Sequence, residues 1–203
     1  KAVNYFSKLN NVKTVVPALE ISSYINISHG KYTYNSSVYG IPLKEMEMLG
    51  YKTDQGGFDK YREKNAALFG NQIIQFFSDS QGNNPKYKYD ENYNISESEF
   101  DFMKDTFTSC AKNQNSDSEG GNYSLTQENG NDESSTGSPS QPSTGSSSQP
   151  SNGGTQRFNV IGTLKKASND SEAATAIYID LDLAKQIVNE SIRLSNIRNY
   201  KLT

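Results

Sequence analysis

A tandem octapeptide decides how this chain divides: Ser135-Thr136-Gly137-Ser138-Pro139-Ser140-Gln141-Pro142 is followed at once by Ser143-Thr144-Gly145-Ser146-Ser147-Ser148-Gln149-Pro150. The repeat lies inside a longer tract, residues 113–156, whose only sizeable apolar side chains are Tyr123 and Leu125. Ordering a backbone costs roughly 1–2 kcal/mol per residue, and this tract has almost nothing to bury in return. The tract therefore predicts a disordered loop that separates a long core-forming part from a short one.

The two flanking parts together are large enough for one domain. About 160 of the 203 residues lie outside the tract. The chain has 20 basic and 23 acidic residues, and five of the acids lie in the tract, so the remainder is close to neutral. This balance argues against nucleic acid or an anionic membrane as the main partner. The single cysteine, Cys110, excludes an intrachain disulfide, and no apolar run is long enough to span a membrane.

Residues 157–203, after the tract, predict two strands and a helix. Apolar and polar residues alternate from Phe158 to Leu164, and a second apolar strand follows from Thr175 to Ile179, which together suggest a hairpin. Asp180 or Asp182 then caps a final helix. A segment of this size, below about 50 residues and without disulfide or metal, rarely folds alone. We therefore expect it to complete a single domain begun by residues 1–112, with 113–156 as a loop inside that domain.

The opening segment predicts an amphipathic helix. Its apolar residues recur at spacings of three and four and form the candidate packing and assembly stripe: Val3, Phe6, Leu9, Val12, Val16 and Leu19. Pro17 predicts a kink or the start of a second helix. The apolar pattern continues through Ile25, and His29-Gly30 supplies a stop.

The middle of the first part reads as more helical than extended. Residues 31–39 and 87–93 suit short strands, whereas residues 43–49, 58–77 and 96–110 each predict a helix. The predicted fold class is therefore α+β, with the N-terminal amphipathic helix packed on a small antiparallel sheet and the low-complexity loop inserted.

Candidate chemistry is sparse. Asp180 and Asp182 could bind a cation or act as an acid–base pair, although helix capping explains them more simply. His29 and Cys110 are the only residues of their types, and a helix cap and a packed thiol are the simpler interpretations. The run Lys86-Tyr87-Lys88-Tyr89 could contact glycan or single-stranded nucleic acid, but Asp90 and Glu91 cancel its charge, so a solvated edge strand accounts for it better. The sequence predicts no catalytic set, no cofactor and no metal site.

Two short stretches resemble the globular head of type IV pilins and pseudopilins. One is Val16-Pro17-Ala18-Leu19-Glu20 through Tyr24, followed by Gly30-Lys31-Tyr32, and the other is Ala176-Ile177-Tyr178-Ile179 followed by Leu183-Ala184-Lys185-Gln186-Ile187-Val188. The resemblance implies a helical spine on an antiparallel sheet, and a filament subunit whose apolar assembly helix lies upstream of Lys1. Thr33 replaces the usual proline after the loop tyrosine, and no C-terminal cysteine pair exists.

The function predicted from these observations is that of a non-enzymatic, pilin-like filament subunit at the cell surface or outside the cell. It would act through contacts with other protein subunits, without nucleic acid, and would meet a membrane only through a segment absent from this chain. The first alternative is a virion structural protein, and the second is a hydrolase or metal-binding protein that uses Asp180 and Asp182.

Overall fold

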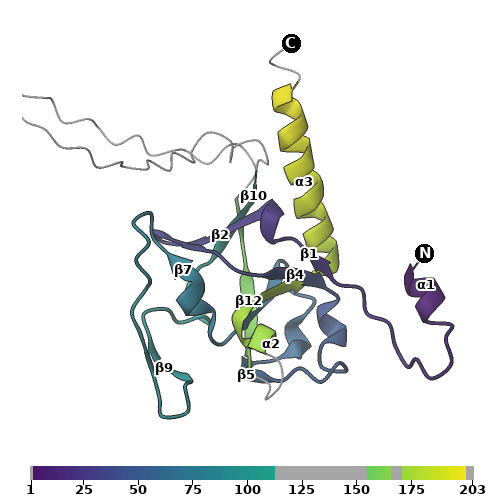
Figure 1. The fold of residues 1–203 in the computed structure, drawn as a ribbon, viewed down its shortest axis with the longest axis horizontal. Helices are drawn as coiled ribbons and strands as arrows, with labels where there is room; N and C mark the ends of the chain where they lie inside the picture. Colours follow the sequence, from purple (N-terminus) through teal and green to yellow (C-terminus); the bar gives the residue numbers. More distant parts are fainter. Residues whose placement is uncertain (1, 113–154, 166–170, 200–203) are drawn as a thin grey trace, which may run out of the picture.

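The computed structural model describes residues 2–112, 155–165 and 171–199, which form three sheets and a long C-terminal helix (Figure 1). The strands are β1 (Leu19–Glu20), β2 (Ile25–His29), β3 (Tyr32–Tyr34), β4 (Val38–Ile41), β5 (Thr53–Gly56), β6 (Ala66–Gly70), β7 (Phe77–Ser78), β8 (Tyr87–Tyr89), β9 (Ile95–Ser98), β10 (Thr108–Ala111), β11 (Gln156–Arg157), β12 (Asn159–Leu164) and β13 (Ile177–Asp180). The helices are α1 (Ala2–Phe6), α2 (Ser171–Thr175) and α3 (Leu181–Asn199), with 3₁₀ turns η1 (Ser22–Tyr24), η2 (Leu43–Glu45), η3 (Phe58–Lys60) and η4 (Ile73–Phe76).

The largest sheet has six strands in the order β1-β4-β13-β6-β12-β5. Strand β13 is parallel to β4 and antiparallel to β6, while β12 is parallel to β6 and antiparallel to β5. The sheet is therefore mixed, and strands from residues 157–203 lie between strands from residues 19–70. The hairpin predicted for β12 and β13 is wrong, because β6 separates them. The strands themselves, and the helix after Asp180, are confirmed.

Strand β6 is buried on both faces. Ala67 and Phe69 belong to the main core cluster, and Ala66 and Leu68 to a second cluster on the other face. A strand covered on both sides is a continuous apolar run, which periodicity alone does not distinguish from a buried helix. The helix predicted for residues 58–77 is wrong for this reason, since the segment contains η3, β6, η4 and the start of β7.

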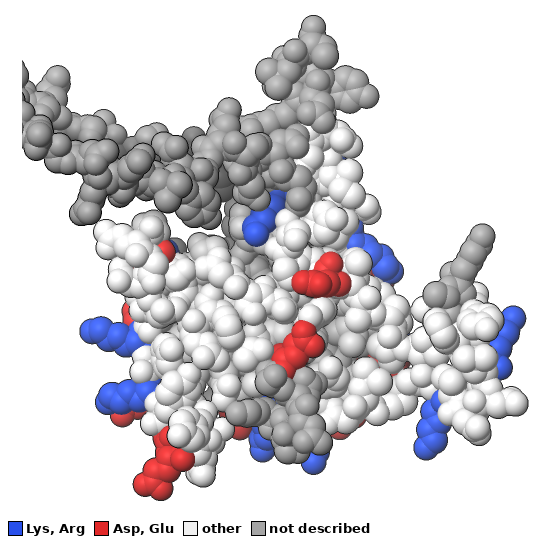
Figure 2. All heavy atoms as spheres, in the orientation of Figure 1, with Lys and Arg blue, Asp and Glu red and all other residues white. Residues whose placement is uncertain are grey.

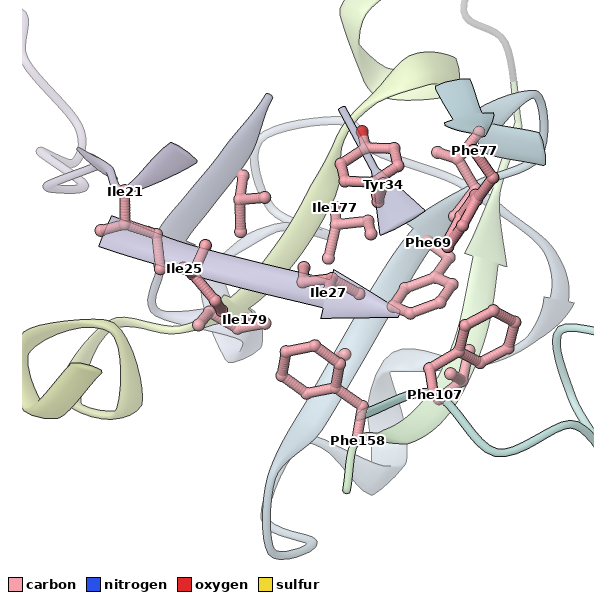
Figure 3. Packing of buried hydrophobic residues seen from close by; sticks show 14 of the residues in the cluster. Ile21, Ile25, Ile27, Tyr34, Phe69, Phe77, Phe107, Phe158, Ile177 and Ile179 are labelled. Carbon is pink, nitrogen blue, oxygen red and sulfur yellow. The ribbon is translucent and has the colours of Figure 1, made fainter. Parts of the chain in front are cut away.

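The main core lies between the six-stranded sheet and a second, five-stranded sheet in the order β11-β10-β2-β3-β7. Figure 3 shows side chains from both sheets meeting there, with Ile25 and Ile27 from β2 and Ile177 and Ile179 from β13. Phe107 is fully buried, and its ring centroid lies 5.0 Å from that of Phe69. The opposite face of the large sheet is covered by the loops around η2.

Helix α3 packs on the large sheet through its first half. Leu183, Ala184 and Ile187 are buried, and a Cβ added to Gly40 of β4 would lie 2.1 Å from the Cβ of Ala184. Glycine at this position therefore lets the helix approach the strand closely. Further along the helix Ser191 is fully buried and Leu194 packs against the main core, while Ile192 is exposed. The end of the helix extends beyond the sheets (Figure 1).

The N-terminal segment, residues 2–14, does not form the predicted helix. Only Ala2–Phe6 are helical, and the side chains of residues 3–14 are exposed. Asn10 and Asn11 interrupt the stripe, Asn11 adopts a φ of 70°, and Pro17 follows. Beyond them Ile25–His29 is strand β2. The predicted fold class, an N-terminal amphipathic helix packed on a small antiparallel sheet, is therefore wrong.

Two further predictions concern residues 96–110 and the low-complexity tract, residues 113–156. The helix predicted for residues 96–110 is wrong, because strands β9 and β10 flank a turn there. The loop predicted for residues 113–156 falls almost wholly outside the described residues, so the division of the chain around it stays a prediction. Within the described ranges, no helix is both long enough and apolar enough to cross a membrane.

Candidate binding cleft

A polar cleft of about 630 Å³ opens between β5, at one end of the large sheet, and the hairpin of β8 and β9. We call it the β5–β9 cleft. Its described lining is Asp54, Gln55, Asn71, Asn94, Ile95, Ser96, Ser98, Phe100, Asp101, Phe102, Thr163 and Lys165. Amide and hydroxyl side chains dominate this lining, so the cleft is built for hydrogen bonding.

One wall is an edge strand. In the described structure β5 pairs with β12 on one side only, and β9 pairs only with β8. Edge strands carry backbone N–H and C=O groups that are available for pairing. Gly56 holds β5 close to β12, because it has a φ of 68° and an added Cβ would lie 2.1 Å from the Ile161 carbonyl oxygen. The cleft is thus bordered by two strands that each have a free side.

The other wall is a hairpin with an ordered turn. The Asp90 Oδ1 accepts hydrogen bonds from the backbone N–H groups of Asn92 at 2.8 Å and Asn94 at 2.9 Å. These bonds, chiefly the one from Asn94, hold the pKa of Asp90 below its usual value. Tyr93 has a φ of 60°, which is unusual for a bulky residue, and its side chain is exposed. The turn therefore presents Asn94 to the cleft and Tyr93 to solvent.

The hairpin is fixed to the body of the molecule. The buried Gln72 donates from Nε2 to the Tyr93 carbonyl oxygen at 3.1 Å, and Tyr89 Oη donates to Gln75 Oε1 at 3.1 Å. Ile95 packs against the main core. Both walls of the β5–β9 cleft are therefore formed before any ligand binds.

Asn71 supplies the most informative polar atom of the cleft. It follows β6 directly, and its backbone N–H donates to the Leu164 carbonyl oxygen at 3.1 Å. Its side-chain Oδ1 is buried and has no hydrogen-bond partner among the described residues. Leaving such an acceptor unsatisfied costs about 1–3 kcal/mol, and native structures rarely tolerate it without a reason.

The charges of the cleft have both signs. Asp101 accepts from Lys104 Nζ at 2.6 Å and from the Met103 backbone N–H at 3.1 Å, and the Lys104 bond lowers the pKa of the Asp101 carboxyl. Asp54 and Lys165 are exposed. The described lining contains no histidine or cysteine. The side chains of the cleft can therefore donate hydrogen bonds to a polar ligand and accept hydrogen bonds from it. They can also pair with a ligand group of either charge.

Asp180 and Asp182, the candidate acid–base or metal pair, form a helix cap, so the simpler interpretation of these two residues is confirmed. The Asp180 Oδ1 accepts from the Asp182 backbone N–H at 3.0 Å, and Asp182 forms an ion pair with Lys185 at 2.8 Å. Both belong to the junction of β13 and α3 rather than to the β5–β9 cleft. In the described ranges, no group of three or more His, Cys, Asp or Glu side chains could hold a metal ion.

His29 and Cys110 take structural positions. The helix cap predicted for His29 is wrong, because the residue ends strand β2. Its ring lies against Phe100 and Phe107, with centroids 4.6 and 4.9 Å away. Its Nδ1 lies 3.0 Å from the Thr106 carbonyl oxygen. Cys110 is half-buried in β10, and burial raises the pKa of its thiol, which favours the unreactive protonated form.

The remaining predicted site residues are dispersed. Val3, Phe6, Leu9 and Val12 are exposed, Val16 packs against the second core cluster, and Leu19 lies in β1. In the run from Lys86 to Tyr89, Lys88 forms an ion pair with Glu97 across the hairpin at 2.6 Å.

The residues of the cleft were not predicted from the sequence. Asn71 is one asparagine among many, and Asp54 lies in a segment with no clear period. The available signals were Gly56-Gly57 and the Asp-to-Asn spacing of the Asp90 turn, both of which indicate turns rather than a site.

No protein-family model matches this chain, and no curated protein matches it. One similar solved structure is the extracellular domain of the noncanonic ABC-type transporter YknZ from Gram-positive bacteria, at 12% identity and a TM-score of 0.41 over 91% of this chain. Another is the periplasmic region of MacB from Actinobacillus actinomycetemcomitans, at 14% identity and a TM-score of 0.37 over 88% of this chain. The match covers 63% and 53% of those chains, less than two thirds of either. With TM-scores below 0.5, these likenesses do not carry function over to this chain.

The resemblance to type IV pilins is wrong. Val16 to Glu20 contains no helix and ends in strand β1, and Gly30-Lys31-Tyr32 forms the β2–β3 connection. The N-terminal helical spine that the resemblance implies is therefore not found in the described residues. The predicted filament subunit is wrong with it. The virion and hydrolase alternatives gain no support from the fold, the cleft or these similarities. The predicted location outside the cell or at its surface stays a prediction.

Proposed function

We propose that this chain is a non-enzymatic binding domain that works outside the cell or at its surface and holds an extended segment of another protein in the β5–β9 cleft. The observation that carries this proposal is the unpartnered Asn71 Oδ1 in a cleft bordered by two edge strands. Asn71 lines the cleft, and a rotation of its side chain would bring this buried oxygen to a peptide N–H donor.

Edge strands favour an extended polypeptide over other ligands. A peptide that pairs with a free strand gains main-chain hydrogen bonds, and its alternate side chains enter the neighbouring pockets. The hydroxyl and amide groups of Gln55, Ser96 and Thr163 line the cleft beside those edges. They supply further bonds to polar side chains of the peptide.

The fixed hairpin favours binding because the cleft need not be ordered when the peptide arrives. Gln72 and Gln75 hold the turn and strand β8 in place through the bonds to Tyr93 and Tyr89. Walls that are formed beforehand reduce the entropy lost on association. Since Asp54 and Lys165 carry opposite charges, we expect peptides of mixed rather than strongly acidic or basic composition.

The test begins with the full chain and a phage-displayed library of random linear peptides. Recovered peptides are synthesised, and their affinity is measured by fluorescence anisotropy against the wild type and Asn71→Leu. Loss of one hydrogen bond should weaken binding about tenfold. The Tm of Asn71→Leu should not fall, because the substitution removes an unsatisfied buried acceptor.

Asn35→Leu is the matched control. The Asn35 Nδ2 donates to Ser78 Oγ at 2.8 Å, away from the cleft. This variant should lose stability and keep the peptide affinity. Peptides whose affinity is unchanged by Asn71→Leu, or a library that yields no peptide binding better than its scrambled version, would contradict the proposal.

Hydrogen exchange gives an independent readout of strand pairing. Bound peptide should slow the exchange of amides in β5 or β9, the two strands with free edges. Protection confined to β7 or β11 instead would place the ligand on the other sheet.

A further inference from the structure

The N-terminal segment concentrates exposed apolar side chains. Ten large hydrophobic residues are exposed in the described structure, and five of them fall within residues 3–12: Val3, Tyr5, Phe6, Leu9 and Val12. Tyr5 is 66% exposed and Phe6 is 49% exposed, with ring centroids 5.5 Å apart. A contiguous apolar patch of this kind usually marks an interaction site.

The charges of the same segment are all positive. Lys8 and Lys13 are exposed and form no ion pair among the described residues, and the first acidic residue of the chain is Glu20. In the face drawn in Figure 2, the segment at the right carries blue side chains and no red ones. Apolar and basic residues therefore occur together in a stretch that contains no acidic residue.

The segment stands away from the sheets but is anchored at its far end. Figure 1 shows α1 and the loop after it clear of the body. Val16 packs against the second core cluster, and Leu19 of β1 pairs with Gly40 of β4. A surface next to the molecule can thus reach the aromatic rings without any part of the core unfolding.

We propose that the N-terminal segment binds the surface of an anionic phospholipid membrane. Tyr5 and Phe6 enter the boundary between headgroups and acyl chains, and Lys8 and Lys13 bind the anionic headgroups. Aromatic and aliphatic side chains beside lysines are the composition that interfacial anchors use.

A lipid surface suits this segment better than a protein groove does. Recognition of a helix in a groove depends on apolar anchors at i, i+3, i+4 and i+7 of one continuous helix. Here the helix ends at Phe6, and Leu9 and Val12 follow in irregular backbone. A fluid interface can accommodate apolar side chains in such an arrangement, and its negative charge complements the lysines.

The experiment uses the full chain with Phe6→Trp. The sequence has no tryptophan, so this residue becomes the only one. Vesicles of phosphatidylcholine mixed with phosphatidylglycerol should shift its emission to shorter wavelength, and brominated lipids should quench it. Removing the anionic lipid should weaken binding about 25-fold, since each lysine contributes roughly fivefold near an anionic surface.

Three variants test which groups act. Tyr5→Ser combined with Phe6→Ser should abolish vesicle flotation, and Lys8→Gln combined with Lys13→Gln should remove the preference for anionic vesicles. Met48→Ser combined with Leu49→Ser removes two other exposed apolar residues and should leave flotation unchanged. All three should keep the wild-type Tm.

Four results would overturn the inference: an emission spectrum that vesicles do not change, flotation that survives loss of both rings, a Tm lowered by Tyr5→Ser with Phe6→Ser, or a mass by light scattering that falls from dimer to monomer in that variant. The last result would assign the segment to a second copy of the chain. None of these readouts involves the β5–β9 cleft, so the peptide proposal stands or falls separately.

Discussion

Helix α3 and the N-terminal segment both repeat apolar residues at spacings of three and four, yet α3 runs for 19 residues and α1 for five. Helix α3 has an N-cap at Asp180, follows directly from the buried strand β13, and meets Gly40, which leaves room for Ala184. Among the described residues no strand packs against the N-terminal segment from Val3 to Val12, and the positive φ of Asn11 ends its helical backbone. An apolar stripe becomes a packed helix only when the chain also supplies a cap and a surface to receive it.

The largest expected effect is on the free energy of unfolding, and it distinguishes the buried Phe107 from the exposed Phe6. Phe107 is fully buried among other aromatic rings, so Phe107→Ala should lower the free energy of unfolding by about 3–5 kcal/mol. Phe6 packs on no part of the core, so Phe6→Ala should change it by no more than about 0.5 kcal/mol. Urea denaturation measures both. Similar losses in the two variants would show that the N-terminal segment packs on the body.

A second prediction concerns the contact between α3 and β4. Gly40→Ala places a Cβ against Ala184 and should cost about 1–3 kcal/mol through overpacking. Combining it with Ala184→Gly should recover part of the loss, because the second change removes the colliding methyl group. If the double variant loses as much free energy of unfolding as the two single variants together, the close approach of α3 and β4 is not the cause of the loss.

The cap of α3 should have a smaller effect. Asp180→Ala removes the acceptor for the Asp182 backbone N–H and should cost about 1 kcal/mol. Asp182→Ala removes only the surface ion pair with Lys185 and should cost about 0.5 kcal/mol or less. Thermal denaturation followed by circular dichroism ranks the two. The reverse order would mean that the ion pair, not the cap, stabilises the helix start.

The smallest effect is expected at the ion pair between Glu190 and Arg193 of α3. Arg193 hydrogen-bonds Glu190 at 2.8 Å and lowers the pKa of that carboxyl. A lowered folded pKa contributes stability above the ordinary value of 4.5 and loses it as pH falls through the folded value. Glu190→Gln should therefore cost about 0.3–0.5 kcal/mol at neutral pH. The two proteins should converge in acid, and a difference that persists there would have another origin.

The elements that could be predicted are those with local signals. Asn159 and Thr163 interrupt the apolar residues of β12, which favours a strand, and α3 combines an apolar stripe with an aspartate at its start. Strand β6 could not be predicted, because its burial on both faces removes the alternation by which strands are identified. The order of strands depends on contacts between residues that are far apart in the sequence. The position of β6 between β12 and β13 therefore cannot be predicted from the residues around any one of these strands.

The β5–β9 cleft could not be predicted for a related reason. Asn71 and Asp54 lie in different segments and meet the hairpin only after the sheets form. The charge balance of the whole chain also concealed a local feature. The near-neutral folded part argued against an anionic membrane, whereas the acids all lie beyond the N-terminal segment.

The strand order of the large sheet has a consequence for biosynthesis. Strands β4 and β6 leave the ribosome early, but β13, which lies between them, follows β6 by about a hundred residues. At about 5–20 residues per second, the nascent chain waits roughly 5–20 s with two unjoined strands. During that interval β4 and β6 can pair with strands of neighbouring chains on the same polysome. The yield of folded protein in a cell should therefore depend on chaperones that cover these strands until β13 has been synthesised.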